Sequence, residues 1–150
     1  MADIVDSKTR SRMMAGIKGK DTGPEMLVRR FLHKAGFRYR LHDYNLPGCP
    51  DLVLPRYRIV IFVNGCFWHR HQGCKLAYLP KTNLDKWQKK FDQNVIRDQN
   101  NIDALVKTGW RVIVVWECGL RKNPQDVLAL LRSEIKVDKG NHVVQISRRK

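Results

Sequence analysis

Three cysteines and a histidine stand at spacings typical of a metal site. Cys66, His71 and Cys74 lie in one short stretch, and Cys118 comes much later, just after an apolar run. Structural zinc takes four thiolate or imidazole ligands, and three cysteines with one histidine are a familiar set. A loop rich in Gly, His and Arg has little apolar surface to order it, so a metal would do so. The pattern predicts structural zinc; three ordinary buried thiols are the alternative, and Cys49 lies outside the set.

One acid, Asp51, begins a short apolar segment that precedes a buried-looking strand, 58–64. The Pro-Asp pair and this strand resemble the frame of the PD-(D/E)xK nucleases, in which a carboxylate-held Mg²⁺ offsets the charge that develops on phosphate oxygens. That frame has a second acid and a lysine where Phe62-Val63-Asn64 stands here. We expect a Mg²⁺ site at Asp51, with the backbone carbonyl of Val63 in reach of the same ion.

A histidine, His69, lies in the loop after that strand, beside the zinc set but outside it by spacing. Imidazole suits general-base catalysis near neutral pH. Asp98, on a long predicted helix, is a candidate to orient His69 or to offset its charge. Taken singly, a surface histidine and a solvated helical aspartate are the simpler interpretations. Together with Asp51 they predict a nuclease centre.

Two adjacent aromatic residues, Phe67 and Trp68, cannot both face one core. Flat rings inserted between base pairs unstack them at a cost of about a few kcal/mol, least where stacking is already weak. We therefore expect at least one of the two rings to project toward a nucleic acid. Trp87, on the long helix, either joins them or packs in the core.

The charge balance points to a polyanionic partner. The chain has 29 Lys and Arg against 14 Asp and Glu, a formal net charge of +15 in 150 residues. Nucleic acid is the commonest partner of such a field. In the basic segment 1–21, Arg10 and Arg12 are predicted to grip phosphates and Met14 to offer an apolar wedge to a base step; a frayed, solvated terminus is the alternative. No basic amphipathic stretch has an uninterrupted apolar face, which disfavours a membrane surface.

Length and composition predict one domain, 1–150, with a basic arm 1–21, a catalytic core 22–135 and a basic tail 136–150. No apolar run approaches the roughly 18 residues that a membrane span needs. The N-terminus also lacks the apolar core of a signal peptide. We expect a cytoplasmic monomer whose thiols stay reduced or bind metal.

Helices and strands alternate around these residues. Thr22-Gly-Pro-Glu25 is a capping-box pattern, which explains Glu25 locally unless the start of this helix points at Asp51. The 83–107 helix carries an apolar stripe that includes Leu84, Trp87 and Val95. Strands are predicted over 37–44, 51–54, 58–64 and 110–116, with a weak one near 143–146, and helices from 22, over 83–107 and over 124–135. The order αβββαβ predicts an α/β fold, a mixed sheet flanked by helices, which matches a restriction-endonuclease-like core.

Several motifs together resemble the very-short-patch repair (Vsr) endonucleases. The matching stretches run from about residue 5 to 120 and are Arg10-Ser-x-x-Met14, Asp21-Thr-x-x-Glu25, Pro47-Gly-x-Pro-Asp51, Phe62-Val-Asn-Gly-Cys-Phe-Trp-His69, the Cys/His set, Asn94-x-x-Arg-Asp98 and Gly109-Trp-Arg-Val-x-x-x-Trp-Glu-Cys118. The resemblance implies a Mg²⁺-dependent DNA repair endonuclease that nicks the T strand 5′ to the T of a T:G mismatch left by deaminated 5-methylcytosine. It also implies a functional link to a cytosine-5 DNA methyltransferase and to downstream repair proteins.

The resemblance implies roles for particular residues. Asp51 would be the metal ligand and His69 the base, with Glu25 and Asp98 as supporting acids. Zinc would bind Cys66, His71, Cys74 and Cys118, and the rings of Phe67, Trp68 and Trp87 would enter the base stack from one groove, with Met14 entering from the other.

Position 64 departs from the family pattern, because some members have a histidine there and this chain has Asn64. An amide binds water or phosphate but does not exchange a proton at neutral pH, so the proton role falls on His69. Two other functions stay open. The missing acid-x-lysine motivates a zinc-stabilised DNA-binding module with a non-catalytic nuclease fold, and a restriction-type nuclease would cut both strands of matched DNA.

Overall fold

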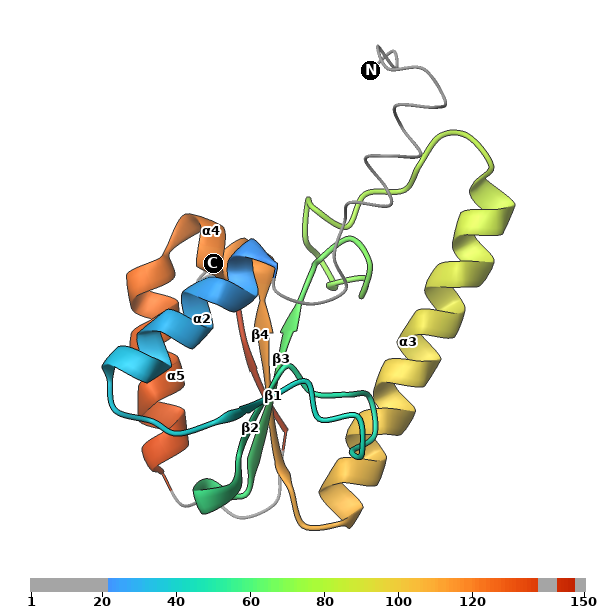
Figure 1. Ribbon diagram of the computed structural model, residues 1–150. Helices are drawn as coiled ribbons and strands as arrows, with labels where there is room; N and C mark the ends of the chain where they lie inside the picture. The colour runs from blue at the N-terminus through green and yellow to red at the C-terminus, as the bar shows by residue number, and fades with distance from the viewer. Residues whose placement is uncertain (1–21, 138–142, 148–150) are drawn as a thin grey trace.

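The computed structural model describes residues 22–137 and 143–147. These residues form a five-stranded mixed sheet with helices on both faces (Figure 1). The strand order is β1-β2-β3-β4-β5, antiparallel from β1 to β3 and parallel from β3 to β5. The strands are β1 Arg40–Leu41, β2 Leu52–Leu54, β3 Ile59–Asn64, β4 Arg111–Trp116 and β5 Val143–Ile146. The apolar strand β3 lies in the middle of the sheet, as its composition predicts.

Helices α2, α4 and α5 lie on one face of the sheet, and the long helix α3 lies on the other (Figure 1). Their bounds are α2 Gly23–Lys34, α3 Leu84–Lys107, α4 Glu117–Lys122 and α5 Pro124–Lys136. α3 is the crossover between the parallel strands β3 and β4, a connection that antiparallel strands do not need. The predicted mixed α/β fold with flanking helices is confirmed; the short helix α4 was not predicted. Among the described residues, no helix combines the length and the apolarity that crossing a bilayer requires.

Two apolar layers hold these helices on the sheet. Side chains alternate across a strand, so β3 supplies both layers. Ile61 packs with Val28 of α2 and Leu131 of α5 on one face, and Val60 packs with Leu105 of α3 on the other. All five side chains are fully buried. Burial of each contributes about 1.5–3 kcal/mol, and together they fix α2 and α3, which carry the predicted site residues Glu25, Trp87 and Asp98.

The strand predicted over 37–44 is wrong in length, because only Arg40–Leu41 is paired as β1. Phe37 instead closes the preceding helix: its N–H donates to the carbonyl of Leu32, and its buried ring packs against Tyr57. At the other end, His42 has a φ of 47°. This left-handed conformation turns the chain out of the strand and ends the regular pairing.

The apolar stripe predicted along the 83–107 helix is only partly buried. Leu84 and Val95 are 44% and 45% exposed. The first half of α3 leans away from the strands, whereas its last turns lie beside β4 (Figure 1). These two residues fit the helical stripe by spacing but do not join the core, since periodicity does not reveal how much of a helix lies on a sheet.

Part of the segment 136–150, predicted as a basic tail, belongs to the sheet. Val143–Ile146 forms β5, which pairs with β4 in parallel, and Ile146 is buried in the α2/α5 layer. The indole N–H of Trp116 also donates to the side-chain oxygen of Gln145 at 3.2 Å. β5 thus covers the edge of β4, which would otherwise be open.

Candidate active site

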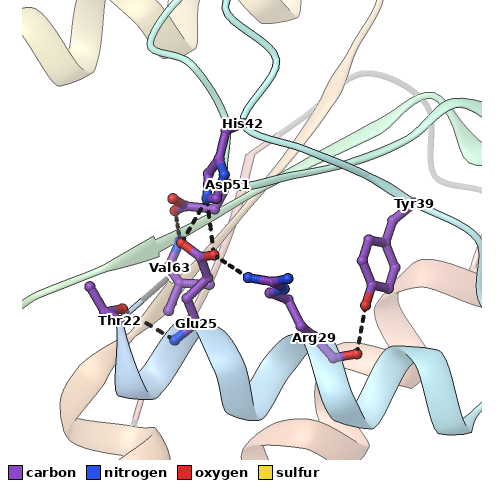
Figure 2. Close-up of polar contacts among 7 residues, drawn as sticks. All are labelled: Thr22, Glu25, Arg29, Tyr39, His42, Asp51 and Val63. Atoms are coloured by element: carbon purple, nitrogen blue, oxygen red, sulfur yellow. Dashed lines mark hydrogen bonds and ion pairs between the residues drawn. The ribbon is translucent and has the colours of Figure 1, made fainter. Parts of the chain in front are cut away.

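The first turn of α2 and the β1–β2 hairpin bring two carboxylates and an imidazole together (Figure 2). Nε2 of His42 lies 3.0 and 3.1 Å from the two carboxylate oxygens of Glu25. One side-chain ligand atom from each of Glu25, His42 and Asp51 lies within 4.8 Å of the other two. Glu25 is only 1% exposed. This cluster is a candidate cation site, here called the acid–imidazole cluster.

Thr22 caps α2 as predicted, with its hydroxyl accepting the N–H of Glu25 at 3.3 Å. The Glu25 carboxylate turns inward, toward His42 and toward Arg29, whose guanidinium lies 3.4 Å away. The start of this helix therefore does point at Asp51, which was the condition for a role of Glu25 in a metal site. The first turn of one helix thus holds both the capping contact and a buried acid.

Burial and a neighbouring acid make Asp51 hard to ionise. The pKa of its carboxyl is raised to about 7. Removal from water is the main cause, and the charge of Glu25 is a smaller cause in the same direction. The N–H of Val63 opposes the shift by donating to Oδ2 of Asp51 at 2.7 Å. A divalent cation would offset the charge of two carboxylates held this close. The donor set therefore fits a hard cation.

Val63 also places its backbone carbonyl oxygen on the side of β3 that faces Asp51. In an antiparallel ladder the N–H and the C=O of one residue face the same neighbouring strand. Because the N–H of Val63 points at Asp51, its carbonyl lies on that edge too. This geometry is compatible with the prediction that the Asp51 carboxylate and the Val63 carbonyl bind the same Mg²⁺ ion.

His69 and Asp98 meet across the gap between the loop after β3 and α3. Nδ1 of His69 lies 2.6 Å from Oδ2 of Asp98. The two side chains are 35% and 29% exposed, so solvent and a substrate can reach them. With Nδ1 held by the carboxylate, Nε2 is the ring atom that can accept a proton from outside.

Asp51 and His69 line the same cleft. Its volume is about 490 Å³, and Val63 and Asn64 line it between the two side chains, with His42 on its wall. Asn64 is 8% exposed. His42 and Asp51 of the acid–imidazole cluster and His69 of the His69–Asp98 pair therefore open onto one space.

The four predicted zinc ligands also come together. Cys66, His71, Cys74 and Cys118 each bring a ligand atom to within 4.8 Å of the others. Nδ1 of His71 lies 3.6 Å from Sγ of Cys66 and 3.4 Å from Sγ of Cys118. The imidazole ring is stacked on Trp116, with ring centres 4.2 Å apart. Three thiols and one imidazole around one point fit a tetrahedral metal ion.

Electrostatics of this cysteine cluster also favour a cation. Burial raises the pKa of the Cys66 thiol well above its ordinary value, and the neighbouring thiols of Cys118 and Cys74 raise it further. The N–H of Cys118 donates to Sγ of Cys66 at 3.4 Å, which favours the thiolate form. A bound cation would instead favour the charged thiolate form of these cysteines. Cys49 is not part of this cluster.

The aromatic residues of the loop form a cluster at the first half of α3. The Phe67 ring is centred 5.0 Å from Trp68, 5.7 Å from Trp87 and 5.2 Å from Phe91. Trp87 is stacked on Phe91 and half-buried, and it belongs to neither apolar layer of the sheet. Phe67, Trp68 and His69 line a hollow of about 580 Å³ next to the cleft of Asp51. The rings and the imidazole therefore face a common surface.

Two side chains hold this loop: Arg70, which the sequence did not single out, and Asn94, which it gave only as the first residue of a motif, with no role. The guanidinium of Arg70 donates to the carbonyls of Phe67, Ala77 and Tyr78 at 2.8 to 3.1 Å and lies 3.9 Å from the centre of the Phe91 ring. The Asn94 amide donates to the carbonyl of Trp68 at 3.2 Å. No sequence pattern identifies these contacts, because they depend on the path of an irregular loop.

His42 was missed as well, although its signal was present. β1 and β2 pair Arg40 with Val53 and Leu41 with Leu52. The next pair in this register is His42 with Asp51, and the N–H of His42 donates to the Asp51 carbonyl at 3.2 Å. A correct register for the hairpin would have predicted the contact. Arg10, Arg12 and Met14 lie outside the described residues.

Comparisons with known proteins agree with one another. A family model described as DNA mismatch endonuclease Vsr matches residues 2–75. The chain is 48% identical over 120 residues to the type II nicking enzyme V.XorIIP of Xanthomonas oryzae pv. oryzae, over 80% of this chain and 88% of that one. It is 47% identical over 121 residues to the type II nicking enzyme V.NmeAIP of Neisseria meningitidis, over 81% and 86%. It is 46% identical over 121 residues to the DNA mismatch endonuclease Vsr of Escherichia coli K12, over 81% and 77%.

Proposed function

The chain belongs to the Vsr family of DNA mismatch endonucleases, and we propose that it nicks the T strand of a T:G mismatch on the 5′ side of the T. The mismatch would arise by deamination of 5-methylcytosine, so the substrate links this enzyme to a cytosine-5 DNA methyltransferase and to the repair proteins that act on the nick. The αβββαβ core would be of the restriction-endonuclease type, in one domain that acts as a monomer in the cytoplasm.

One observation carries this proposal: Asp51 and His69 line a single cleft of about 490 Å³. A phosphodiester in that cleft would contact a cation-binding carboxylate on one side and a proton acceptor on the other. Hydrolysis needs both, because negative charge develops on the phosphate oxygens while water loses a proton. The cleft also lies beside the hollow of Phe67 and Trp68, so the base step and the scissile phosphate would be bound together.

Asp51, with the carbonyl of Val63, would hold Mg²⁺, and Glu25 would support it. The ion supplies positive charge for the phosphate oxygens and favours loss of a proton from water. His69 would take that proton at Nε2 while Asp98, 2.6 Å from Nδ1, keeps the ring oriented and offsets its positive charge. The amide of Asn64, in the wall of the cleft, would hydrogen-bond a phosphate oxygen or water.

Zinc would be held by Cys66, His71, Cys74 and Cys118, and it supplies a structural cross-link rather than chemistry. Cys66 and His71 belong to the loop that carries Phe67 and His69, and Cys118 is the second residue of α4, which follows β4. The four ligands would therefore fix that loop against the sheet. A fixed loop keeps the rings and the imidazole in constant positions relative to Asp51.

Recognition of the mismatch would rest on the aromatic cluster. Phe67 and Trp68 would enter the base stack, with Trp87 behind them and the ammonium of Lys90 lying 5.2 Å from the Trp68 ring centre. Unstacking costs least where pairing is already distorted, so this wedge would favour T:G over T:A. Met14 would enter the stack from the other groove, and Arg10 and Arg12 would grip phosphates.

A nicking assay tests the proposal. A duplex labelled on each strand, with one T:G pair, is incubated with the zinc-loaded protein, with and without added MgCl₂; a T:A duplex is the control. We expect a single nick in the T strand that requires Mg²⁺. Tight binding without cleavage would instead support a non-catalytic DNA-binding module, and cleavage of both strands of the T:A duplex would support a restriction-type nuclease.

A further inference from the structure

The acid–imidazole cluster contains one nitrogen donor that the proposed Mg²⁺ site does not use. His42 extends from the turn after β1 toward Glu25 and Asp51 (Figure 2). Its backbone φ of 47° is uncommon for a residue other than glycine, and histidine is among the side chains that tolerate it. The turned backbone and the β1–β2 register together aim the imidazole at the two acids.

We propose that His42 is a third side-chain ligand of the cation held by Asp51 and Glu25, and that its nitrogen makes this site favour Mn²⁺ over Mg²⁺. The inference rests on the proposed function in one respect, the presence of a divalent cation at Asp51. It concerns the identity of the metal and of its ligands, which the nicking reaction leaves open.

The spacing of the donor atoms supports ligation. Nε2 of His42 lies 3.0 and 3.1 Å from the two oxygens of Glu25, so it faces the carboxylate as a whole rather than one oxygen. Neighbouring ligand atoms of a six-coordinate ion with bonds of about 2.1 Å are about 3 Å apart. The structure therefore already holds this nitrogen and these oxygens at the spacing that ligands of one ion adopt.

The charges around the cluster also leave a place for the ion. Glu25 contacts Arg29 at 3.4 Å, and Asp51 accepts the N–H of Val63 at 2.7 Å. Within the described residues, the guanidinium of Arg29 on α2 and the N–H of Val63 on β3 are thus among the groups that face the two carboxylates. All three ligand atoms of the cluster lie within 4.8 Å of one another, a span that one ion can bridge.

The metal preference follows from ligand chemistry. Mg²⁺ strongly prefers oxygen and keeps much of its water, so it gains little from an imidazole. Transition metals accept imidazole nitrogen together with carboxylate oxygen, and Mn²⁺ is the member of that series closest to Mg²⁺ in behaviour. A site with two carboxylates, one carbonyl and one imidazole should therefore bind Mn²⁺ more tightly than an all-oxygen site does.

Pulsed EPR of the zinc-loaded protein with one equivalent of MnCl₂, without DNA, tests ligation directly. We expect electron spin echo envelope modulation from a directly bound imidazole nitrogen. The signal should vanish in His42→Gln, which keeps an N–H donor for Glu25 but removes the ring nitrogen. It should persist in His33→Gln, which changes an exposed histidine in the last turn of α2, and in His69→Gln.

Calorimetric titrations with MnCl₂ and with MgCl₂ give the second measurement. In His42→Gln we expect the Kd for Mn²⁺ to rise by about tenfold or more and the Kd for Mg²⁺ by less than about threefold. Equal losses for both metals would mean that His42 only positions Glu25, and would overturn the proposal. Absence of nitrogen modulation in the unsubstituted protein would overturn it without any variant.

The outcome is separable from that of the nicking assay. A protein that shows nitrogen modulation but does not nick a T:G duplex supports ligation by His42 and contradicts the proposed function. A protein that nicks with Mg²⁺ and shows no modulation supports the proposed function and overturns ligation by His42.

Discussion

The carboxylate of Asp98 and the imidazole of His69 are joined by a contact of 2.6 Å, from Oδ2 to Nδ1, that connects α3 to the loop after β3. The contact has a chemical consequence, because a carboxylate at Nδ1 keeps the proton on that nitrogen and leaves Nε2 as the acceptor. It also has a mechanical one, since the ring cannot rotate without losing the bond. We therefore infer that Asp98 acts as a positioning residue for His69.

Replacement of His69 by alanine should slow nicking of a T:G duplex by about 10²–10⁴-fold, the usual effect of losing a general base. Asp98→Asn should give a smaller loss, and the double variant should be about as slow as His69→Ala, because Asp98 acts through the imidazole. Single-turnover rates at saturating Mg²⁺ measure this. Asp103→Asn, an exposed acid on α3, is the control. Additive losses would contradict a shared role.

Asp51→Asn should abolish nicking while DNA affinity changes little. The amide keeps the size of the side chain, but it lacks the charge that holds a divalent cation. Most of the DNA affinity would come from the basic surface, which this substitution leaves unchanged. Gel-shift titrations and nicking rates on the same T:G duplex separate the two effects. Residual nicking near the original rate would remove Asp51 from the reaction.

Without added divalent cation, the protein should lose stability as the pH rises from about 4 to about 7. The pKa of Asp51 is raised from 3.8 to about 7 by burial and by Glu25, so the folded state holds a proton that the unfolded state has released. In that window the unfolded chain binds fewer protons, and the free energy of unfolding therefore falls with pH. At about 1.4 kcal/mol per pH unit the upper limit is about 4 kcal/mol.

Chemical unfolding at pH 5 and pH 8 measures this loss. Asp51→Asn should remove most of the difference between the two values, since the amide does not ionise. Added MgCl₂ should raise stability at pH 8 more than at pH 5, because the charged carboxylate binds the ion. A pH dependence that is unchanged in Asp51→Asn would assign it to other groups.

Much of this site could be read from the sequence, for physical reasons that differ between residues. Cys66, His71 and Cys74 are close in the chain, so their meeting requires only a loop. Asp51 and Val63 belong to one hairpin, whose turn fixes their approach. Local spacing therefore predicts these contacts, whereas the central position of β3 is predicted by its run of apolar residues, 59–63.

Other parts depend on long-range packing, which spacing does not encode. Leu84 and Val95 have the periodicity of buried residues, yet they lie on the half of α3 that leans away from the sheet. Arg70 holds its loop through backbone carbonyls, and carbonyls are present in every sequence. His42 is an intermediate case, because its approach to Asp51 follows from the hairpin register, which the overlong strand prediction obscured.

Cys118→Ser should lower both the zinc content and the stability of the protein. Cys118 would be the ligand that ties the loop of Cys66 and His71 to the end of β4, so its loss should free the loop. A loss of about 3 kcal/mol would lower Tm by about 6–12 °C. Elemental analysis and thermal melts measure the two effects, with Cys49→Ser as the control. Less than about half an equivalent of zinc in the unsubstituted protein would contradict a structural zinc site.

Trp68→Ala and Phe67→Ala should reduce the preference for T:G over T:A more than they reduce overall DNA affinity. Both rings line the hollow next to His69, and a ring stacked on a base contributes about 1–3 kcal/mol, or roughly tenfold or more in the ratio of nicking rates. Trp110→Phe is a matched control, because Trp110 precedes β4 and packs under the guanidinium of Arg58. The ratio of kcat/KM for the two duplexes, with Kd for each, measures the effect. Equal losses on both duplexes would show that these rings only support the fold of the loop.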